Sequence, residues 1–224
     1  MDNSFNIKGL KITVPNKVLT ENVAIRMARN NYETSEYRAL KKHLRPSDIY
    51  LDIGGGVGFT SCAAAEIVTP KNITVLEANP ILIPAIKQNL RQNGFAGATV
   101  IHGAASEETS EEKVILSHGD GFWAGHTIIG RRKLKNQILV PVVSFLSLLR
   151  NTEPTFIGMD IEGMELGLFK ETLPNSVRFI SMETHSGIYG HDGLKGLMQD
   201  IFNQGFGYVP DGSAGQQLCF EKLL

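Results

Sequence analysis

Short apolar runs and amphipathic stretches alternate along most of the chain. From Ile49 onward, short runs of β-like composition are followed by stretches whose apolar positions recur at helical spacing. This alternation predicts strands over 49–53, 73–77, 98–102, 155–160 and 178–183, helices over 58–68, 81–93, 163–172 and 193–203, and a last strand near 216–221. Strands that alternate with helices pair in parallel through right-handed crossovers, so the pattern predicts a doubly wound α/β fold.

Two parts of the chain depart from this rhythm. Near the start, residues 6–14 alternate weakly and predict a short β segment, while 21–29 and 34–44 predict helices. Between residues 105 and 151, glycines punctuate short β-like runs. This stretch is therefore interpreted as an insertion with β character.

The length and composition fit a single globular domain. The chain has 224 residues, of which 42% are hydrophobic and 20% charged. A chain of this size forms one domain with a buried core rather than two full domains. We expect one domain over 1–224, with 1–45 as an N-terminal cap, 46–224 as the main body, and the β-rich insertion near 105–151 within it.

The charge balance argues against a polyanionic partner. The chain carries 22 basic and 23 acidic residues, a formal net charge of −1, so it has no overall positive field to attract nucleic acid. The basic clusters at 41–45 and 131–135 are typical of solvated faces. We expect no nucleic-acid partner, and the oligomeric state stays open.

Neither a membrane span nor a metal-binding motif is indicated. The first twenty residues hold no apolar core of signal-peptide length, and the apolar segment 138–149 is short and contains Pro141. Cys62 and Cys219 lie far apart without metal-type or redox spacing, and we expect both to be reduced and buried. The predicted location is the cytoplasm, with no membrane partner and no bound metal.

A glycine-rich run follows the predicted strand 49–53. Asp52, Gly54, Gly56 and Gly58 form a D-x-G-x-G-x-G pattern directly before a predicted helix. Glycines at such a turn let the backbone approach a ligand closely, and the helix start offers unpaired N–H groups. A dinucleotide fingerprint would require a further glycine at Phe59. The pattern alone leaves open a simple turn or another kind of nucleotide site.

An acidic residue stands at the end of the next predicted strand. A carboxylate at the position of Glu77 can accept both hydroxyls of a ribose. Asn79 and Pro80 favour the start of a helix beside that site, and Pro84 predicts a kink or a late start of that helix. The glycine run and Glu77 together therefore predict a nucleoside-containing ligand.

Asp52 followed by alternate glycines resembles the first motif of the large Rossmann-like class of methyltransferases, in which this loop wraps the methionine part of S-adenosylmethionine. The resemblance implies that S-adenosylmethionine is the cofactor, with an antiparallel last strand in the sheet. It also places adenine near residues 102–105, so Ala104 is a predicted main-chain contact. His102 is interpreted as packed and hydrogen-bonded rather than stacked on the base.

Four further stretches narrow the resemblance to the FkbM-type methyltransferase family. They are Tyr50–Gly54, Leu76–Pro80, Asn89–Gly94 and, most distinctively, the D-x-E-G-x-E run within Met159–Glu165. Members of that family are typically O-methyltransferases. The resemblance implies methyl transfer to a hydroxyl of a sugar or another small natural-product-like acceptor.

Three residues are candidates for catalysis on the acceptor side. Asp160, Glu183 and His185 follow two predicted parallel strands, whose carboxyl ends face the ligand in an open sheet. Glu183 and His185 point to one face, and His185 is a hypothetical general base. The same carboxylates and imidazole could in principle hold a divalent metal, but no compact ligand motif supports one. Glu162 and Glu165 fall at the start of the predicted helix 163–172, where acids are favoured by the helix dipole. We interpret Glu165 as structural and leave Glu162 open.

The inserted stretch 119–132 carries Phe122, Trp123 and His126 among glycines. Aromatic rings flanked by polar groups suit the wall of an acceptor pocket or a lid. An equally weighted alternative is that Trp123 anchors the insertion on the core.

Three other functions stay open. A nicotinamide-dependent oxidoreductase is disfavoured by the missing glycine at residue 59. A methyltransferase that acts on protein or nucleic acid would share the cofactor but not the acceptor. A non-catalytic module that has kept the cofactor fold is separated from an enzyme only by turnover.

Overall fold

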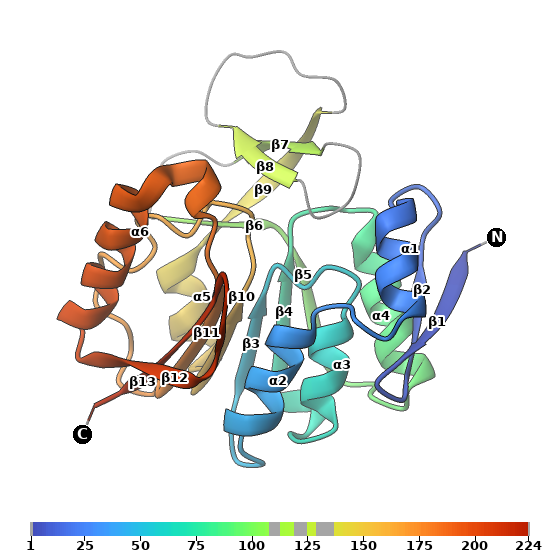
Figure 1. The fold of residues 1–224 in the computed structure, drawn as a ribbon, viewed down its shortest axis with the longest axis horizontal. Helices are drawn as coiled ribbons and strands as arrows, with labels where there is room; N and C mark the ends of the chain where they lie inside the picture. Colours follow the sequence, from blue (N-terminus) through green and yellow to red (C-terminus); the bar gives the residue numbers. More distant parts are fainter. Residues whose placement is uncertain (1, 108–112, 119–124, 129–136, 224) are drawn as a thin grey trace.

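The computed structural model describes residues 2–107, 113–118, 125–128 and 137–223, with the backbone alone for 113–118, 125–128 and 137. A seven-stranded sheet, in the order β12-β13-β11-β10-β3-β4-β5, forms the centre of the molecule (Figure 1). Its strands are β3 (Tyr50–Ile53), β4 (Ile73–Glu77), β5 (Thr99–His102), β10 (Phe156–Met159), β11 (Phe179–Glu183), β12 (Phe206–Ala214) and β13 (Gln217–Lys222).

The pairing confirms the predicted sheet. The five strands from β5 to β11 run parallel, whereas β13 is antiparallel to both β11 and β12. Every residue of β3 and β10 is buried, as expected for central parallel strands covered on both faces. The sheet is therefore mostly parallel, with an antiparallel last strand.

Helices cover both faces of the sheet (Figure 1). They are α1 (Glu21–Ala28), α2 (Thr34–His43), α3 (Phe59–Ala65), α4 (Leu82–Gln92), α5 (Phe145–Thr152) and α6 (Ser186–Asn203), with a short 3₁₀ turn, η1 (Pro70–Asn72). Successive strand residues point to opposite faces, so Tyr50 packs in the core beneath α1–α4 and Leu51 in the core beneath α5 and α6. These three layers make the doubly wound fold that the alternation predicts.

The N-terminal β segment forms a hairpin rather than a single run. β1 (Asn3–Ile7) and β2 (Leu10–Val14) pair antiparallel on either side of a two-residue turn. The Asn89 side chain of α4 accepts a hydrogen bond from the Thr13 N–H at 2.8 Å and donates one to the Thr13 carbonyl at 3.0 Å. These bonds tie the N-terminal cap to the main body.

The predicted helix over 163–172 is wrong, because this stretch consists of turns. Glu162 has a φ of 54° and Gly163 one of 97°, and Gly167 is also left-handed at 90°. Left-handed residues at these positions interrupt the right-handed helical path. Glu162 and Glu165 are consequently held by turns beyond β10 instead of by the first turn of a helix.

Two elements near the C-terminus differ from the predictions. β12 was not predicted because Pro210, Asp211 and Gly212 have the composition of a turn. The strand accommodates them through a register shift against β13 between Val209 and Ala214. α6 begins earlier than the predicted start at residue 193 and is interrupted at Gly190, where φ is 72°.

The β character of the insertion is confirmed. β6 (Ala104–Ser106), β7 (Lys113–His118), β8 (Gly125–Ile128) and β9 (Gln137–Ser144) form a second sheet, in the order β6-β9-β7-β8, that projects from the main body (Figure 1). Phe122 and Trp123 lie outside the described residues, and only the backbone of His126 is described. A lid or pocket wall in this segment stays a prediction.

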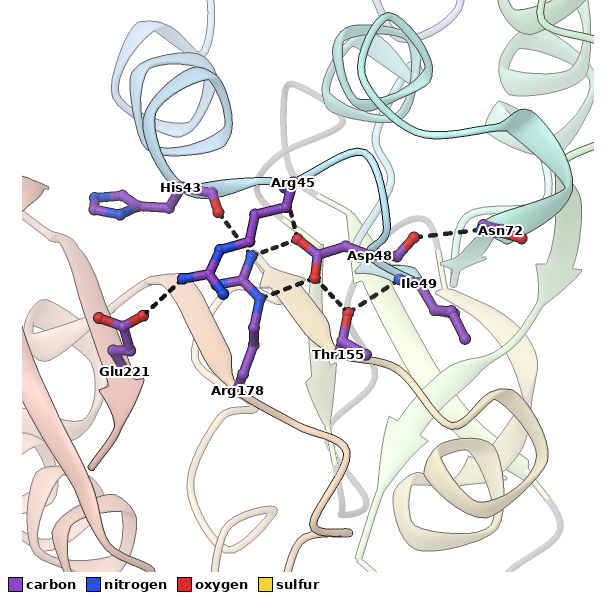
Figure 2. Close-up of polar contacts among 8 residues, drawn as sticks. All are labelled: His43, Arg45, Asp48, Ile49, Asn72, Thr155, Arg178 and Glu221. Atoms are coloured by element: carbon purple, nitrogen blue, oxygen red, sulfur yellow. Dashed lines mark hydrogen bonds and ion pairs between the residues drawn. The ribbon is translucent and has the colours of Figure 1, made fainter. Parts of the chain in front are cut away.

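A buried ion pair joins three elements at the end of the sheet opposite the glycine run (Figure 2). Arg178, just before β11, donates from Nε to Asp48 Oδ1 at 2.9 Å and pairs through its second nitrogen with Asp48 Oδ2. Thr155 Oγ1 also donates to Asp48, at 2.7 Å. Although burial opposes the shift, the Arg178 bonds hold the pKa of Asp48 below its usual value. The pair aligns the amino ends of β3, β10 and β11.

The two cysteines, Cys62 and Cys219, are buried free thiols, as the sequence predicts. Among the described residues, no helix combines the length and the apolar character needed to cross a membrane.

Candidate active site

The glycine run forms a tight loop between β3 and α3. Gly54 has a φ of 88°, and a Cβ placed on it would lie 1.7 Å from the Asp160 carbonyl oxygen. Only glycine fits there, because the loop crosses directly over the end of β10. The crossing brings the glycine loop beside Asp160 across the centre of the sheet.

Asp52 supports the loop from below. It is 4% exposed and accepts hydrogen bonds from Thr60 Oγ1 at 2.9 Å, from Tyr50 Oη at 3.3 Å and from the Ser61 hydroxyl. Burial raises its pKa, against the effect of these donors. Asp52 therefore fastens the first turn of α3 to the end of β3.

Glu77 ends β4 and lies opposite the loop. It is 7% exposed and accepts the Gly56 N–H at 2.8 Å and the Asn79 N–H at 2.6 Å. Burial raises the pKa of Glu77 to about 7, even though both hydrogen bonds favour the ionised form. A buried carboxylate at the end of a parallel strand is suited to hold ribose hydroxyls.

The helix after Glu77 starts late, as Pro84 predicts. The Asn79 side chain accepts the Ile81 N–H at 3.0 Å, and α4 begins at Leu82. Pro84 then lies in the first turn, where its missing N–H removes no intrahelical bond. Asn79 thus shapes the rim of the site through this turn.

A cavity of about 530 Å³ opens at the carboxyl ends of the central strands. Eight of the ten residues predicted from sequence to form the site line it: Gly54, Gly56, Glu77, Asn79, Ala104, Asp160, Glu183 and His185. Asp52 and Gly58 do not line it, because Asp52 is buried in β3 and Gly58 is the residue directly before α3. A cavity of this size accommodates a drug-sized ligand, and its lining is rich in polar groups.

The predicted adenine contact at Ala104 stays a prediction, and the structure places this residue in the cavity wall. Ala104 opens β6, is 7% exposed, and lines the cavity beside Gly103. His102 lies outside the lining, and its Nε2 lies 3.1 Å from the Ala78 carbonyl oxygen. His102 is thus packed and hydrogen-bonded rather than placed against a ligand.

The three catalytic candidates meet at the other end of the cavity. Met159 and Met182 are register partners of the parallel strands β10 and β11, so Asp160 and Glu183 follow side by side. One ligand atom each from Asp160, Glu183 and His185 lie within 4.8 Å of one another. Burial and the nearby Glu183 and Glu162 carboxylates raise the pKa of Asp160 well above its usual value.

His185 is held by a carboxylate on its far side. Its Nδ1 lies 2.8 Å from Oε1 of Glu165, which is fully buried and also accepts the Gly163 N–H at 3.1 Å. Although burial opposes it, the Glu165 hydrogen bond raises the pKa of His185 to about 9, with further contributions from Asp160 and Glu162. The structural interpretation of Glu165 as a helix-dipole partner is wrong, because no helix forms there and Glu165 contacts the His185 ring.

The N-terminal cap supplies acids that the sequence analysis missed. Glu33 and Glu36, at the start of α2, line the same cavity together with Arg26 of α1. Burial raises the pKa of Glu36 to about 7, with a further rise from its contact with Glu183. The left-handed Glu33, at a φ of 43°, carried no recognisable motif, and acids near a helix start are usually interpreted as helix-dipole partners.

Curated relatives of this chain are methyltransferases by name. The "Probable cobalt-precorrin-6B C(15)-methyltransferase (decarboxylating)" of Methanosarcina mazei is 29% identical over 119 residues, which cover 50% of this chain and 65% of that protein. The protein-L-isoaspartate O-methyltransferase of Methanothermobacter thermautotrophicus is 34% identical over 70 residues, or 31% of this chain and 32% of that protein. The chain thus spans less than two thirds of the length of either relative.

Solved structures show the same fold. P. horikoshii TYW2 in complex with MeSAdo has a TM-score of 0.52 at 10% identity, covering 98% of this chain and 69% of that chain. The M. jannaschii tRNA m1G37 methyltransferase has a TM-score of 0.50 at 14% identity, covering 99% and 54%. The Rossmann-like fold of the class I methyltransferases is therefore confirmed.

The comparisons support the predicted methyltransferase class but do not show the FkbM-type family. No family model matches the chain, and nothing in the relatives or solved structures is specific to the FkbM-type family. One of the solved structures above is named for a tRNA methyltransferase and one of the curated relatives for a protein methyltransferase. The class of acceptor is therefore not defined by similarity.

Proposed function

We propose that this chain is an S-adenosylmethionine-dependent methyltransferase that methylates a hydroxyl of a small acceptor. The observation that carries the proposal is the shared cavity, which joins the Gly54–Gly56 loop and Glu77 to Asp160, Glu183 and His185. One end has the groups for a nucleoside, and the other has groups that exchange protons. Methyltransferase relatives support the class and the cofactor.

The cofactor's parts correspond to distinct residues. Glu77 would accept hydrogen bonds from the ribose hydroxyls, and Ala104 would contact adenine through its main chain. The methionine part follows the backbone of Gly54 and Gly56, whose lack of side chains leaves room for it. A cofactor held by these residues would supply its methyl group within the cavity that Asp160 also lines.

Methyl transfer is an in-line displacement. The acceptor oxygen forms a bond to the methyl carbon as the carbon–sulfur bond breaks, and the electron pair stays on sulfur to give S-adenosylhomocysteine. Alignment of oxygen, carbon and sulfur supplies much of the rate enhancement. The hydroxyl proton would pass to the group formed by Asp160, Glu183 and His185, which lines the same cavity.

The cavity favours a small, uncharged acceptor. Its described acidic residues include Glu33, Glu36 and Glu162, against Arg26 and His185 as the basic ones. An acidic wall repels phosphates, which disfavours a nucleic-acid backbone near the transferred methyl group. A sugar or another hydroxylated metabolite, the acceptors typical of the FkbM-type family, suits these groups better.

A screen for labelled-methyl transfer tests the proposal. The full chain is incubated with methyl-labelled S-adenosylmethionine and sets of sugars, lipids and small hydroxylated metabolites, and tRNA and protein are included as competing classes. We expect transfer to a small hydroxylated compound and its loss in Glu77→Ala. Transfer to RNA or protein alone would refute the acceptor assignment while keeping the cofactor.

A further inference from the structure

We propose that Asp160, Glu183 and His185 bind a divalent cation at the acceptor end of the cavity. The carboxylates lie at the ends of adjacent parallel strands, and His185 directly precedes α6. One oxygen or nitrogen from each of the three lies within 4.8 Å of the others. A cation placed among them would be within coordination distance of all three after small side-chain rotations.

The orientation of His185 points to a ligand independently of the acids. The residue is 9% exposed, and Glu165 accepts a hydrogen bond from its Nδ1 at 2.8 Å. A histidine that binds metal through one ring nitrogen almost always donates the other N–H to a carboxylate or carbonyl. The buried Glu165 thus holds the ring so that Nε2 faces the cavity, and a bound metal would displace the Nε2 proton.

Nε2 itself faces carboxylates at a separation too long for good hydrogen bonds. Asp160 Oδ1 lies 3.5 Å away and Glu162 Oε2 lies 3.4 Å away, whereas N–H···O bonds are usually about 2.7–3.2 Å long. Asp160 Oδ1 is buried and accepts no hydrogen bond from the described residues. A buried carboxylate oxygen without a donor is costly, and a bound cation would satisfy it.

The charge around these residues also calls for a cation. The described lining brings the acids Glu33, Glu36 and Glu162 to the same end of the cavity as the three candidate ligands. The sulfonium of the proposed cofactor adds only one positive charge. A divalent cation would offset part of the charge of these half-buried carboxylates.

The ligand types indicate which ions fit. Carboxylate oxygens suit Mg²⁺, Ca²⁺ and Mn²⁺, and an imidazole nitrogen shifts the preference toward first-row transition metals. Mn²⁺ is therefore expected to bind more tightly than Mg²⁺. If the proposed function holds, the cation would orient the acceptor hydroxyl and lower its pKa, and the proton would pass to a lining carboxylate that is not a ligand, such as Glu36.

Titration of the full chain with Mn²⁺, followed by electron paramagnetic resonance of the free ion, tests the site. We expect one tight site in the native protein, and its loss in Asp160→Asn and in Glu183→Gln. Glu171→Gln, which alters an exposed acid outside the cavity, is the matched control and should bind normally. Circular dichroism establishes that each variant is folded. If one of the two cavity variants fails to fold, the other alone tests the site.

Glu165→Gln tests the positioning role of the buried carboxylate. Loss of such a partner typically weakens metal affinity by about 10–100-fold, whereas a purely structural residue would lower the melting temperature and leave the Mn²⁺ affinity of the folded protein unchanged. No Mn²⁺ binding by the native chain, or equal binding by native protein, Asp160→Asn and Glu183→Gln, would overturn the proposal.

A third variant separates this inference from the proposed function. Glu77→Ala should lose affinity for S-adenosylmethionine and keep its Mn²⁺ site, because Glu77 lies at the nucleoside end of the cavity. Cofactor binding without Mn²⁺ binding would reject the cation site alone. Mn²⁺ binding without cofactor binding would reject the proposed function alone.

Discussion

At the scale of single residues, the site depends on buried carboxyl groups that differ in their partners. Glu77 accepts two backbone N–H groups, Glu165 contacts a histidine ring, and Asp160 has a buried oxygen with no donor among the described residues. The position of Glu77 was predictable because strand ends are visible in the apolar pattern. The contact between Glu165 and His185 was not, since it depends on left-handed turns that brought distant residues together.

Cofactor binding should depend on the ionisation of Glu77. Its pKa of about 7 means that the carboxyl is largely protonated at pH 6, when it is a weaker acceptor for ribose hydroxyls. We expect the affinity for S-adenosylmethionine to rise between pH 6 and pH 8 in native protein. Calorimetry at several pH values measures this affinity, and Glu77→Gln, which should bind more weakly, is the control. The cofactor's own titration affects both proteins equally. If affinity changed with pH to the same extent in both, this role of Glu77 would be contradicted.

The same raised pKa fixes the sign of a stability effect. The unfolded carboxyl ionises near its ordinary pKa of 4.5, whereas the folded one keeps its proton to about pH 7. Glu77 therefore makes the cofactor-free protein less stable as pH rises from about 4.5 to about 7. Urea unfolding across this range should show a shallower decline for Glu77→Gln, and parallel curves would argue against the raised pKa.

Removal of the imidazole should impair turnover more than folding. We expect His185→Ala to lower kcat by about 10²-fold or more, the usual range for a lost acid–base group, while cofactor affinity changes little. Rates from pH 6 to pH 9 are the measurement, once an acceptor is known. Full turnover by this variant across that range would remove His185 from the proposed catalytic group.

At the scale of elements, strand ends and loops bring the site together. Every strand of the parallel sheet was predicted, because the four buried strands β3, β4, β10 and β11 form apolar runs and the edge strand β5 is rich in β-branched residues. The turns over 163–172 and strand β12 were not, because local composition favours the opposite structure at both places. β12 forms because its backbone pairs with β13, and the spacing of residues in the sequence does not reveal this pairing.

The crossing of the glycine loop over β10 is a sensitive packing point. Gly54→Ala should destabilise the protein by more than about 2 kcal/mol, because the new methyl group would overlap the Asp160 carbonyl and φ is left-handed. Gly196→Ala, in α6 with open space around it, should be neutral or stabilise by up to about 1 kcal/mol. Chemical unfolding measures both, and equal stabilities would contradict the crossing.

The ion pair at the opposite end of the sheet should contribute to stability rather than to binding. Arg178→Met leaves the buried Asp48 without its charge partner and should lower the free energy of unfolding by about 3 kcal/mol. Lys170→Ala, which removes an exposed pair with Glu107, should cost less than about 1 kcal/mol. Thermal melts distinguish the two, and a harmless Arg178→Met would disprove the structural role.

At the scale of the whole molecule, the sheet order explains why the groups converge. β4 and β5 lie on one side of β3, and β10 and β11 lie on the other, so the connections diverge between β3 and β10. Open α/β sheets bind ligands at such a switch point, beyond the carboxyl ends of the strands. The cavity has this position, with the nucleoside groups on the β4 side and the catalytic candidates on the β10–β11 side.

Calorimetric titration of the full chain with S-adenosylmethionine, and separately with a nicotinamide dinucleotide, tests the central claim most directly. The account predicts stoichiometric binding of S-adenosylmethionine that is lost in Glu77→Ala, and no binding of the dinucleotide. Binding of the dinucleotide together with no heat from S-adenosylmethionine would contradict it.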